Sequence, residues 1–474
     1  MISKSDFLTY LDAPMHLWAK VHDQLEPKVP TLYEQHLIQQ GQLIETLARD
    51  YLQNHLLQQY EDAQFFWQPS YDDDRFEIRA DALIWDRNAE TYDLYEIKSA
   101  SAIHKENEID VTFQVLVLES LLSLRHTYII HINRAYRHNN TLKLERFFSV
   151  EEVSDKIQKR RGLVTQLRQD ALKVAQLAKP LPSFACVKPQ TCPCPELCHP
   201  ELPPNPVYNL PYLGKKATQL REMGIIAIED IPDTFDLNPK QRKHVQAVKH
   251  HQPVIEKSII QQLLSELQFP LYFLDYETFN PALPLFPNYH TYEHILFQYS
   301  LVILSAPGAA PHSIDFLFTD AEDPAPIFSA HLRDHLDPVG SVVVWNKSFE
   351  ANRNKDLAKH CPDLAPYLLS INERLFDLMR IFMEGLYVHP AFHGSASLKS
   401  VLPVLCPALG YEDLRISNGE EASLTWYQLQ KGMISPENQA DIEAALKAYC
   451  HNDTFGLYAI WKHLYELIRS CNDS

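Results

Sequence analysis

Residues 271–278 read Leu-Tyr-Phe-Leu-Asp-Tyr-Glu-Thr, an apolar run that ends in two carboxylates. A run this apolar predicts a central β-strand, because a strand covered on both faces carries nonpolar side chains at successive positions. Asp275 and Glu277 are two residues apart, so their side chains leave the same face of the strand. The stretch therefore predicts the centre of an α/β sheet with an acidic pair at its end.

Two later segments carry side chains that can meet this acidic pair. Tyr449 and Asp453 are four residues apart within 441–468, a strongly helical pattern, so they share one helix face. Residues 342–346 form a second predicted strand, which runs into a helix that carries Glu350. Phosphodiester hydrolysis with two divalent cations needs several carboxylates and a group that orients the attacking water. These segments predict a site for Mg²⁺ or Mn²⁺.

A hairpin is predicted nearer the amino terminus. Residues 79–85 and 91–98 both alternate between polar and apolar side chains, as strands do, and residues 87–90 (Arg-Asn-Ala-Glu) suit a turn between them. The helix predicted next covers residues 110–124, and a buried strand follows it over 127–132.

The hairpin brings a second acidic set together. Asp81 lies on one arm, and Glu96 and Lys98 leave the same face of the other arm. Two carboxylates this close need a cation, and oxygen ligands suit Mg²⁺ or Mn²⁺. A lysine beside that cation can hold the scissile phosphate, and Gln114 on the next helix can reach the same place. The alternative is an ordinary hairpin with charged surface residues.

The cysteines also indicate a metal site. Of the 8 cysteines, one group lies within a short Pro-rich stretch, namely Cys186, Cys192, Cys194 and Cys198. Cysteines in a polar loop have no packing role, so a metal accounts for them better than a disulfide framework does. Cys194 or His199 can complete a local site for a [4Fe–4S] cluster or for Zn²⁺. An empty or lost site is the alternative.

Composition limits the function classes. The 474 residues carry a net charge of −18, which excludes a protein that binds polyanions by bulk charge alone. No P-loop or dinucleotide-binding glycine motif occurs. The amino terminus does not resemble a signal peptide and no membrane span is evident, so we expect a cytoplasmic protein. A basic helix over 156–168 is a candidate for phosphate contacts, with a solvated helix face as the alternative.

The order helix, Asp on a strand, Glu-x-Lys on the next strand and Gln on a helix resembles the PD-(D/E)XK nuclease superfamily, particularly its RecB-like branch. The resemblance covers about the first 180 residues. It implies that Asp81 and Glu96 are metal ligands, that Lys98 is the catalytic lysine and that Gln114 is the helix glutamine. It also suggests Glu45, on the first long helix, as another metal ligand; a solvated helix glutamate is the alternative.

The carboxy-terminal segments resemble the RNase H-like DEDD exonucleases. Asp275-Tyr276-Glu277-Thr278 matches their D-x-E-T motif, and Tyr449-x-x-x-Asp453 matches the Y-x-x-x-D motif of the tyrosine subclass. The middle motif departs from the family, because Glu350 stands where aspartate is expected. The resemblance implies that these carboxylates hold two metals and that Tyr449 positions the nucleophilic water.

RecB-like relatives often carry an iron–sulfur cluster whose first cysteine lies near the amino terminus. In this sequence Ala13 stands where that cysteine is expected, while Cys186, Cys192 and Cys198 resemble the three later ligands. Asp377, in Arg374-Leu375-Phe376-Asp377-Leu378, is a candidate for shaping the site near Asp275, with a capping or surface aspartate as the preferred interpretation.

The whole chain resembles an uncharacterised bacterial family that fuses these parts. We therefore predict a multidomain α/β protein with a restriction-endonuclease-like core, a cysteine-rich segment, a helical connecting module and an RNase H-like domain, at residues 1–180, 181–204, 205–267 and 268–474. The predicted function is metal-dependent hydrolysis of DNA, with RNA as the second choice of substrate, in nucleic-acid processing, repair or phage defence. The alternative is a nucleic-acid-binding scaffold or complex subunit with one or both sites inactive. No membrane partner is expected, and the sequence does not indicate which proteins bind this chain.

Overall fold

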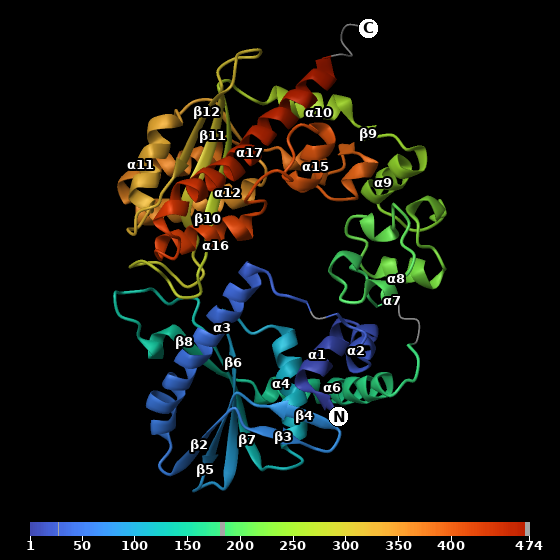
Figure 1. Cartoon of the computed structure of the whole chain (residues 1–474), viewed down its shortest axis with the longest axis vertical. Helices are drawn as coiled ribbons and strands as arrows, with labels where there is room; N and C mark the ends of the chain where they lie inside the picture. The colour runs from blue at the N-terminus through green and yellow to red at the C-terminus, as the bar shows by residue number, and fades with distance from the viewer. Residues whose placement is uncertain (27, 181–184, 470–474) are drawn as a thin grey trace. The chain divides into compact units, whose positions relative to one another are not determined.

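The computed structural model describes residues 1–26, 28–180 and 185–469. Cys471 and residues 181–184, at the start of the predicted cysteine-rich segment, lie outside the described residues. The chain divides into two compact units, whose elements are labelled in Figure 1. The first comprises Met1–Glu201 and Pro281–Glu293, and the second comprises Leu202–Asn280 and His294–Ser474. Both units combine a mixed sheet with helices, which confirms the predicted multidomain α/β class.

The first unit is built on a five-stranded sheet in the order β2-β5-β6-β7-β8. These strands are, in that order, Ala63–Trp67, Ala82–Asp86, Thr91–Lys98, Leu124–Ile132 and Phe148–Glu152. β6 and β7 run parallel, and the other neighbours run antiparallel. β5 and β6 form the predicted hairpin. A smaller sheet, in the order β1-β4-β3, consists of Ile2–Ser3, Phe76–Arg79 and Ser70–Asp72.

Helices cover both faces of the five-stranded sheet, because successive strand residues point to opposite sides. Leu94 joins a core with Phe113 and lies on the side of α1, α4 and α6. The next residue, Tyr95, joins a separate core with Ala48 of α3. The helices of this unit are α1 (Lys4–Asp12), α2 (Pro14–Val21), α3 (Leu32–Tyr51), α4 (Lys105–Leu118), α5 (Leu144–Phe147), α6 (Ser154–Ala175) and α7 (Pro195–Cys198).

Two element boundaries predicted in this unit are wrong. The strand predicted over 79–85 is interrupted, because β4 belongs to the small sheet and β5 begins only at Ala82. Asp81 therefore lies where the chain passes from one sheet to the other, and not on an arm of the hairpin. The helix predicted over 110–124 begins at Lys105, where the His104 N–H donates to the Asn107 side chain (2.9 Å), and it ends at Leu118.

The segment Pro281–Glu293 belongs to the first unit although its neighbours in sequence belong to the second. Its backbone exchanges hydrogen bonds with His138, from the Asn288 N–H (2.8 Å) and to the Tyr289 carbonyl (3.0 Å). The Tyr292 hydroxyl donates to the carbonyl of Ser99, one residue beyond Lys98. Sequence patterns predicted this segment only as part of the 268–474 domain.

The second unit is built on a sheet in the order β12-β11-β10-β13-β14. These strands are His312–Leu317, Ile295–Leu304, Leu271–Phe279, Ser341–Val344 and Leu375–Asp377. β10 lies at the centre, as its apolar run predicted; it pairs antiparallel with β11 and parallel with β13. The residues predicted as a connecting module, 205–267, group with this unit.

Helices also cover both faces of this second sheet. Phe273 packs in a core with residues of α10, α15 and α17, including Leu457. Its neighbours Tyr272 and Leu274 face the opposite core, formed with α11, α12 and α13. The helices of this unit are α8 (Lys215–Glu222), α9 (Pro239–His250), α10 (Lys257–Ser265), α11 (Ala325–His335), α12 (Lys347–His360), α13 (Ala365–Glu373), α14 (Met379–Met383), α15 (Leu398–Leu405), α16 (Gly419–Gln430) and α17 (Pro436–Arg469). A two-stranded pair consists of β9 (Val254–Ile255) and β15 (Tyr387–Val388).

Candidate functional site

Asp81, Glu96 and Asp110 form a first carboxylate cluster, in the first unit. Glu96 lies on β6 and is only 1% exposed. Lys98, on the same strand, donates from Nζ to Glu96 Oε1 (2.7 Å) and to Asp110 Oδ2 (2.6 Å). Asp81 accepts the N–H of Ile97 (2.7 Å), which places its carboxylate beside β6. The structure thus brings together the predicted Asp81, Glu96 and Lys98, and adds Asp110.

Residues from α4 and α1 complete this first cluster. Gln114 Nε2 donates to Glu96 Oε2 (2.9 Å), while its Oε1 is buried and has no partner within the described part of the chain. Lys4 Nζ donates to Glu96 Oε1 (3.2 Å). Sequence reasoning missed Asp110 and Lys4. Asp110 had a usable signal, because it lies four residues before Gln114 on one helix face. Lys4 had none, since its contact spans 92 residues.

In the first cluster, neighbouring carboxylates raise the pKa values of the acids and the lysine ammonium groups lower them. Burial raises the pKa of Asp81 to about 7, and the Glu96 carboxylate adds to that shift. Burial would also raise the pKa of Glu96, but the ammonium groups of Lys98 and Lys4 hold it at about 2. Burial and the Glu96 carboxylate raise the pKa of Asp110. The two lysines therefore compensate much of the acidic charge without any cation.

Glu45 lies half-buried on α3, beside the first cluster. Its carboxylate accepts a hydrogen bond from the Gln68 side chain. The Gln68 backbone N–H in turn donates to the carbonyl oxygen of Asp81 (2.9 Å). Glu45 is thus connected to the cluster through Gln68, and its role as a metal ligand stays a prediction.

Asp275, Glu277, Glu350 and Asp453 form a second carboxylate cluster, in the second unit. β10 carries the first two. Glu350 of α12 and Asp453 of α17 lie close enough for the carboxylates to raise one another's pKa values. Glu350 is 2% exposed, and its Oε2 has no hydrogen-bond partner within the described residues. The structure therefore gathers all the carboxylates that the sequence predicted for this site.

Every carboxyl group of the second cluster has a raised pKa. Burial raises the pKa of Asp275, and the Asp453 carboxylate adds to the shift. Burial likewise raises the pKa of Glu277 and of Glu350, each with a contribution from Asp275. Burial raises the pKa of Asp453 to about 6, although two tyrosine hydroxyls act in the opposite direction. Buried acids that repel one another in this way favour a bound cation or bound protons.

Those hydroxyls belong to the predicted Tyr449 and to Tyr411. The sequence had not indicated Tyr411. Both donate to Asp453. Cys450 was also missed; its Sγ lies 3.9 Å from Asp275 Oδ2, within reach of a cation held by Asp275 and Glu277. Its position next to Tyr449 was the only available signal.

Asp377 lies at the end of β14, close to the second cluster. Its Oδ2 accepts the Lys347 N–H at the start of α12 (3.3 Å), which agrees with the capping role expected from the sequence. Its carboxylate also contributes to the raised pKa of Glu350. Asp377 therefore fixes the helix that carries Glu350.

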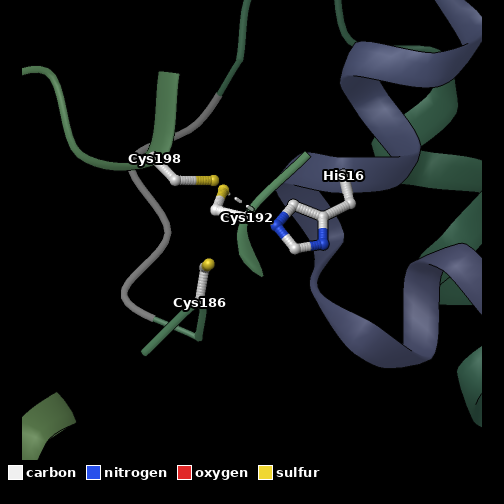
Figure 2. Close-up of side chains that lie close together, drawn as sticks. All are labelled: His16, Cys186, Cys192 and Cys198. Carbon is white, nitrogen blue, oxygen red and sulfur yellow. Dashed lines mark hydrogen bonds between the residues drawn. The ribbon is translucent and has the colours of Figure 1, made fainter. Parts of the chain in front are cut away.

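A third group, the Cys–His cluster, consists of His16, Cys186, Cys192 and Cys198 (Figure 2). One potential ligand atom of each residue lies within 4.8 Å of those of the others. Figure 2 shows the His16 ring, from α2, directed toward the cysteines, with Nε2 at 3.4 Å from Cys192 Sγ. Its Nδ1 pairs with Asp12, the arrangement that orients metal-binding histidines. The cluster can hold a metal ion.

Cys194 does not belong to that group of four, although its Sγ lies 3.7 Å from Cys198 Sγ. His199 contacts the cluster from the other side, with Nε2 at 3.3 Å from Cys186 Sγ. The Cys198 thiol, together with His16 and His199, lowers the pKa of Cys186 to about 3. Cys186 is thereby held as the thiolate, the form that binds metals.

The basic side chains of α6 are largely engaged within the first unit. Arg160 pairs with Glu108 (3.0 Å) and Arg161 with Glu119 (2.5 Å). Arg168 is buried, pairs with Asp73 (2.8 Å) and stacks over the Phe76 ring. These pairs favour the structural interpretation of this helix over phosphate binding.

Comparison with known proteins finds a family model that matches part of the second unit. A family model described as "Domain of unknown function (DUF2779)" matches residues 272–397. The matched region contains Asp275, Glu277 and Glu350 of the second cluster, and it ends before Tyr449 and Asp453.

The chain is similar to two curated mycoplasmal proteins. It is 27% identical over 223 residues to "Uncharacterized protein MG366 homolog" of Mycoplasma pneumoniae, which covers 43% of this chain and 33% of the relative. It is 23% identical over 215 residues to "Uncharacterized protein MG366" of Mycoplasma genitalium, which covers 42% of this chain and 32% of that relative. The chain thus matches about a third of the length of these relatives. No solved structure matches it. Among the helices that the structure describes, none is long and apolar enough to cross a membrane.

Proposed function

We propose that this protein is a metal-dependent nuclease that hydrolyses phosphodiester bonds of DNA, with RNA as the second choice of substrate. The observation that carries the proposal is the convergence of buried carboxylates from distant parts of the chain into the second cluster. Asp275 and Asp453 are 178 positions apart in number (453 − 275), yet the Asp453 carboxylate adds to the raised pKa of Asp275. Repulsion between buried carboxylates destabilises the fold, and a bound cation would relieve it.

The donor atoms fit a hard divalent cation. Carboxylate oxygens are the ligands that Mg²⁺ and Mn²⁺ prefer. Glu350 Oε2 is buried and has no hydrogen-bond partner in the described part of the chain, and such an oxygen is costly unless something binds it. Gln114 Oε1 is in the same condition at the first cluster. A cation bound at each cluster would supply activation of a water molecule and stabilisation of charge on the phosphate.

The chain's own residues would orient the reactants around those cations. At the second cluster Tyr449, whose hydroxyl donates to Asp453, would direct the attacking water. At the first cluster Lys98 would hold the scissile phosphate. Burial lowers the pKa of Lys98, but the Glu96 and Asp110 carboxylates raise it further, so the side chain is an ammonium group. These roles are those implied by the resemblance to PD-(D/E)XK and DEDD nucleases. Nucleic-acid processing, repair or phage defence is the corresponding setting.

The competing proposal is a nucleic-acid-binding scaffold in which the first site is inactive. One observation favours it: both Lys4 and Lys98 donate to Glu96, so the first cluster is compensated without a cation. This proposal differs from the preferred one in a single respect, because it predicts binding of nucleic acid without cleavage by the first unit.

Cleavage assays on two variants separate these proposals. We expect Lys98→Ala and Asp275→Ala each to remove a different Mn²⁺-dependent activity on labelled single-stranded and duplex DNA, by about 100-fold or more. The matched controls are Lys173→Ala and Asp320→Asn, which change exposed residues outside both clusters. Unchanged cleavage in both test variants would show that neither cluster is catalytic. Loss in Asp275→Ala alone would support an inactive first site.

For the Cys–His cluster we propose a resident metal centre, either a [4Fe–4S] cluster or Zn²⁺. The set of three cysteines and one histidine occurs in structural zinc sites, and iron–sulfur centres use thiolates in the same way. Iron and sulfur would give the purified protein an absorbance near ~400 nm, whereas zinc would leave it colourless. We expect His16→Ala to lower the metal content and His22→Ala, at the end of the same helix, to leave it unchanged. Equal metal content in His16→Ala and wild type would exclude His16 as a ligand.

A further inference from the structure

We propose that Lys399 is a substrate-binding residue of the second cluster, where its ammonium group binds the phosphate of the terminal nucleotide. This inference rests on the proposed nuclease function and names the group that would receive the substrate. It concerns a residue beyond the DUF2779 match and outside the acidic and tyrosine motifs.

Local contacts fix the position of Lys399. It is the second residue of α15, whose start is capped by the Ser397 side chain. Its Nζ donates to the carbonyl oxygen of Ser417 (2.7 Å). The same ammonium lies 5.3 Å from the ring centre of Tyr411 and 5.4 Å from that of Tyr449, the two tyrosines that donate to Asp453. Lys399 is thus held next to the two tyrosines of the second cluster.

The ammonium acts on the carboxylates of the cluster from a distance. Its positive charge partly offsets the raised pKa of Glu277 and of Asp453. Yet within the described residues it forms no ion pair with either of them, and the side chain is exposed. A lysine ammonium has three donors, and Ser417 takes one of them. Donors therefore remain for a group that arrives from solvent.

The lysines of the first cluster provide a contrast. Lys98 is engaged by Glu96 and Asp110, and Lys4 by Glu96. Those two lysines neutralise their own cluster. Lys399 does not neutralise its cluster by contact, so its charge is available to an anion bound next to the carboxylates.

Gly419 lies next to the second cluster. A side-chain Cβ at this position would lie 3.8 Å from both Glu277 Oε2 and the Tyr449 hydroxyl oxygen, so the backbone of Gly419 faces the cluster closely. Gly419 is also the first residue of α16, whose first turn carries Glu420 and Glu421, so the positive charge beside the cluster comes from Lys399 and not from this helix start. Lys399 and Gly419 both lie close to Tyr449. A contact between the Lys399 ammonium and a phosphate carries no sequence preference.

The test measures binding and its salt dependence separately from cleavage. The probe is a fluorescein-labelled single-stranded oligonucleotide, titrated with full-length protein in Ca²⁺ and followed by anisotropy at several salt concentrations. The Lys98→Ala background limits the contribution of the first cluster. The variants are Lys399→Gln, which keeps a donor for Ser417, and Lys399→Arg, which keeps the charge. Lys431→Gln is the matched control, because Lys431 lies over the Tyr427 ring (5.7 Å) in the same unit and outside the cluster.

We expect Lys399→Gln to weaken binding by about tenfold for all sequences. We also expect the slope of log affinity against log salt to fall by about 0.7, the value for one lost phosphate contact on a single strand. Lys399→Arg should keep most of that slope, and Lys431→Gln should match the background. Unchanged affinity in Lys399→Gln, or lost affinity with an unchanged salt slope, would overturn the phosphate contact. Wild-type protein that neither binds nor cleaves the oligonucleotide would overturn the proposed function itself.

Discussion

The two carboxylate clusters differ in how they balance their charge. The first places two ammonium groups against three carboxylates, and the pKa of Glu96 falls to about 2 as a result. The second gathers four carboxylates, with no lysine in contact among the residues that the structure describes, and the pKa of every one of them is raised. One cluster is compensated by the chain, whereas the other depends on protons or cations from solvent. Similar acidic motifs in a sequence can therefore produce sites with opposite effects on folding.

The largest expected consequence is a difference in stability without metal. Glu96→Gln should destabilise the protein by about 3 kcal/mol, because it leaves two half-buried lysines without the charge of a fully buried partner. Asp453→Asn should be neutral or stabilising, because it removes repulsion from Asp275 while leaving an oxygen for the tyrosine hydroxyls. Calorimetric unfolding in EDTA measures both effects. A loss of this size corresponds to a fall of about 6–12 °C in the transition of the affected unit.

Exposed acids serve as controls for that comparison. Glu90→Gln and Asp320→Asn make the same chemical changes outside the clusters, so their transitions should stay close to wild type. If Glu96→Gln and Asp453→Asn shift the transitions in the same direction and by similar amounts, the two clusters do not differ as their charges indicate.

A smaller effect is expected in the pH dependence of metal binding. A carboxyl group with a raised pKa holds a proton that a cation must displace, so affinity rises as the pH rises through that pKa. All four acids of the second cluster behave in this way, whereas in the first only Asp81 and Asp110 do and Glu96 is already ionised. Each additional displaced proton adds about a factor of ten in affinity per pH unit.

Calorimetric titration with Mn²⁺ between pH 6 and pH 8 tests this difference. Asp81→Asn leaves the second cluster intact, and Asp275→Asn leaves the first. We expect the affinity of Asp81→Asn to rise more steeply with pH. Equal slopes in the two variants would mean that both clusters carry the same number of protons, contrary to the pKa directions found here.

The elements that periodicity controls were predictable from sequence. β10 is the central strand that its apolar run predicted, because a continuous apolar run is a local property. Spacing also predicted that Asp275 and Glu277 share a face. Asp81 was placed less well, because the change of sheet at Ala82 depends on pairing with distant strands.

Single residues that reach a site from elsewhere were not predictable. Lys4, His16, Tyr411 and Lys399 each lie outside any motif, and their contacts join segments far apart in the chain. The sequence indicated a missing amino-terminal ligand at Ala13, and the structure places His16, three residues later, at the cysteines. One turn of helix separates the two positions, so both can face the same side. Nothing local indicated that Pro281–Glu293 belongs to the first unit.

The smallest expected effect concerns the lysines themselves. Lys4→Met should lower the free energy of unfolding by about 1 kcal/mol, because Glu96 loses one of its two ammonium partners but keeps Lys98 and Gln114. Lys399→Met should cost about 0.5 kcal/mol or less, since the Lys399 side chain is exposed and, among the described residues, forms no ion pair with a carboxylate. Denaturant unfolding in EDTA at constant pH compares the two. A larger loss in Lys399→Met than in Lys4→Met would show that the second cluster is also compensated by the chain, which would remove the distinction between the clusters.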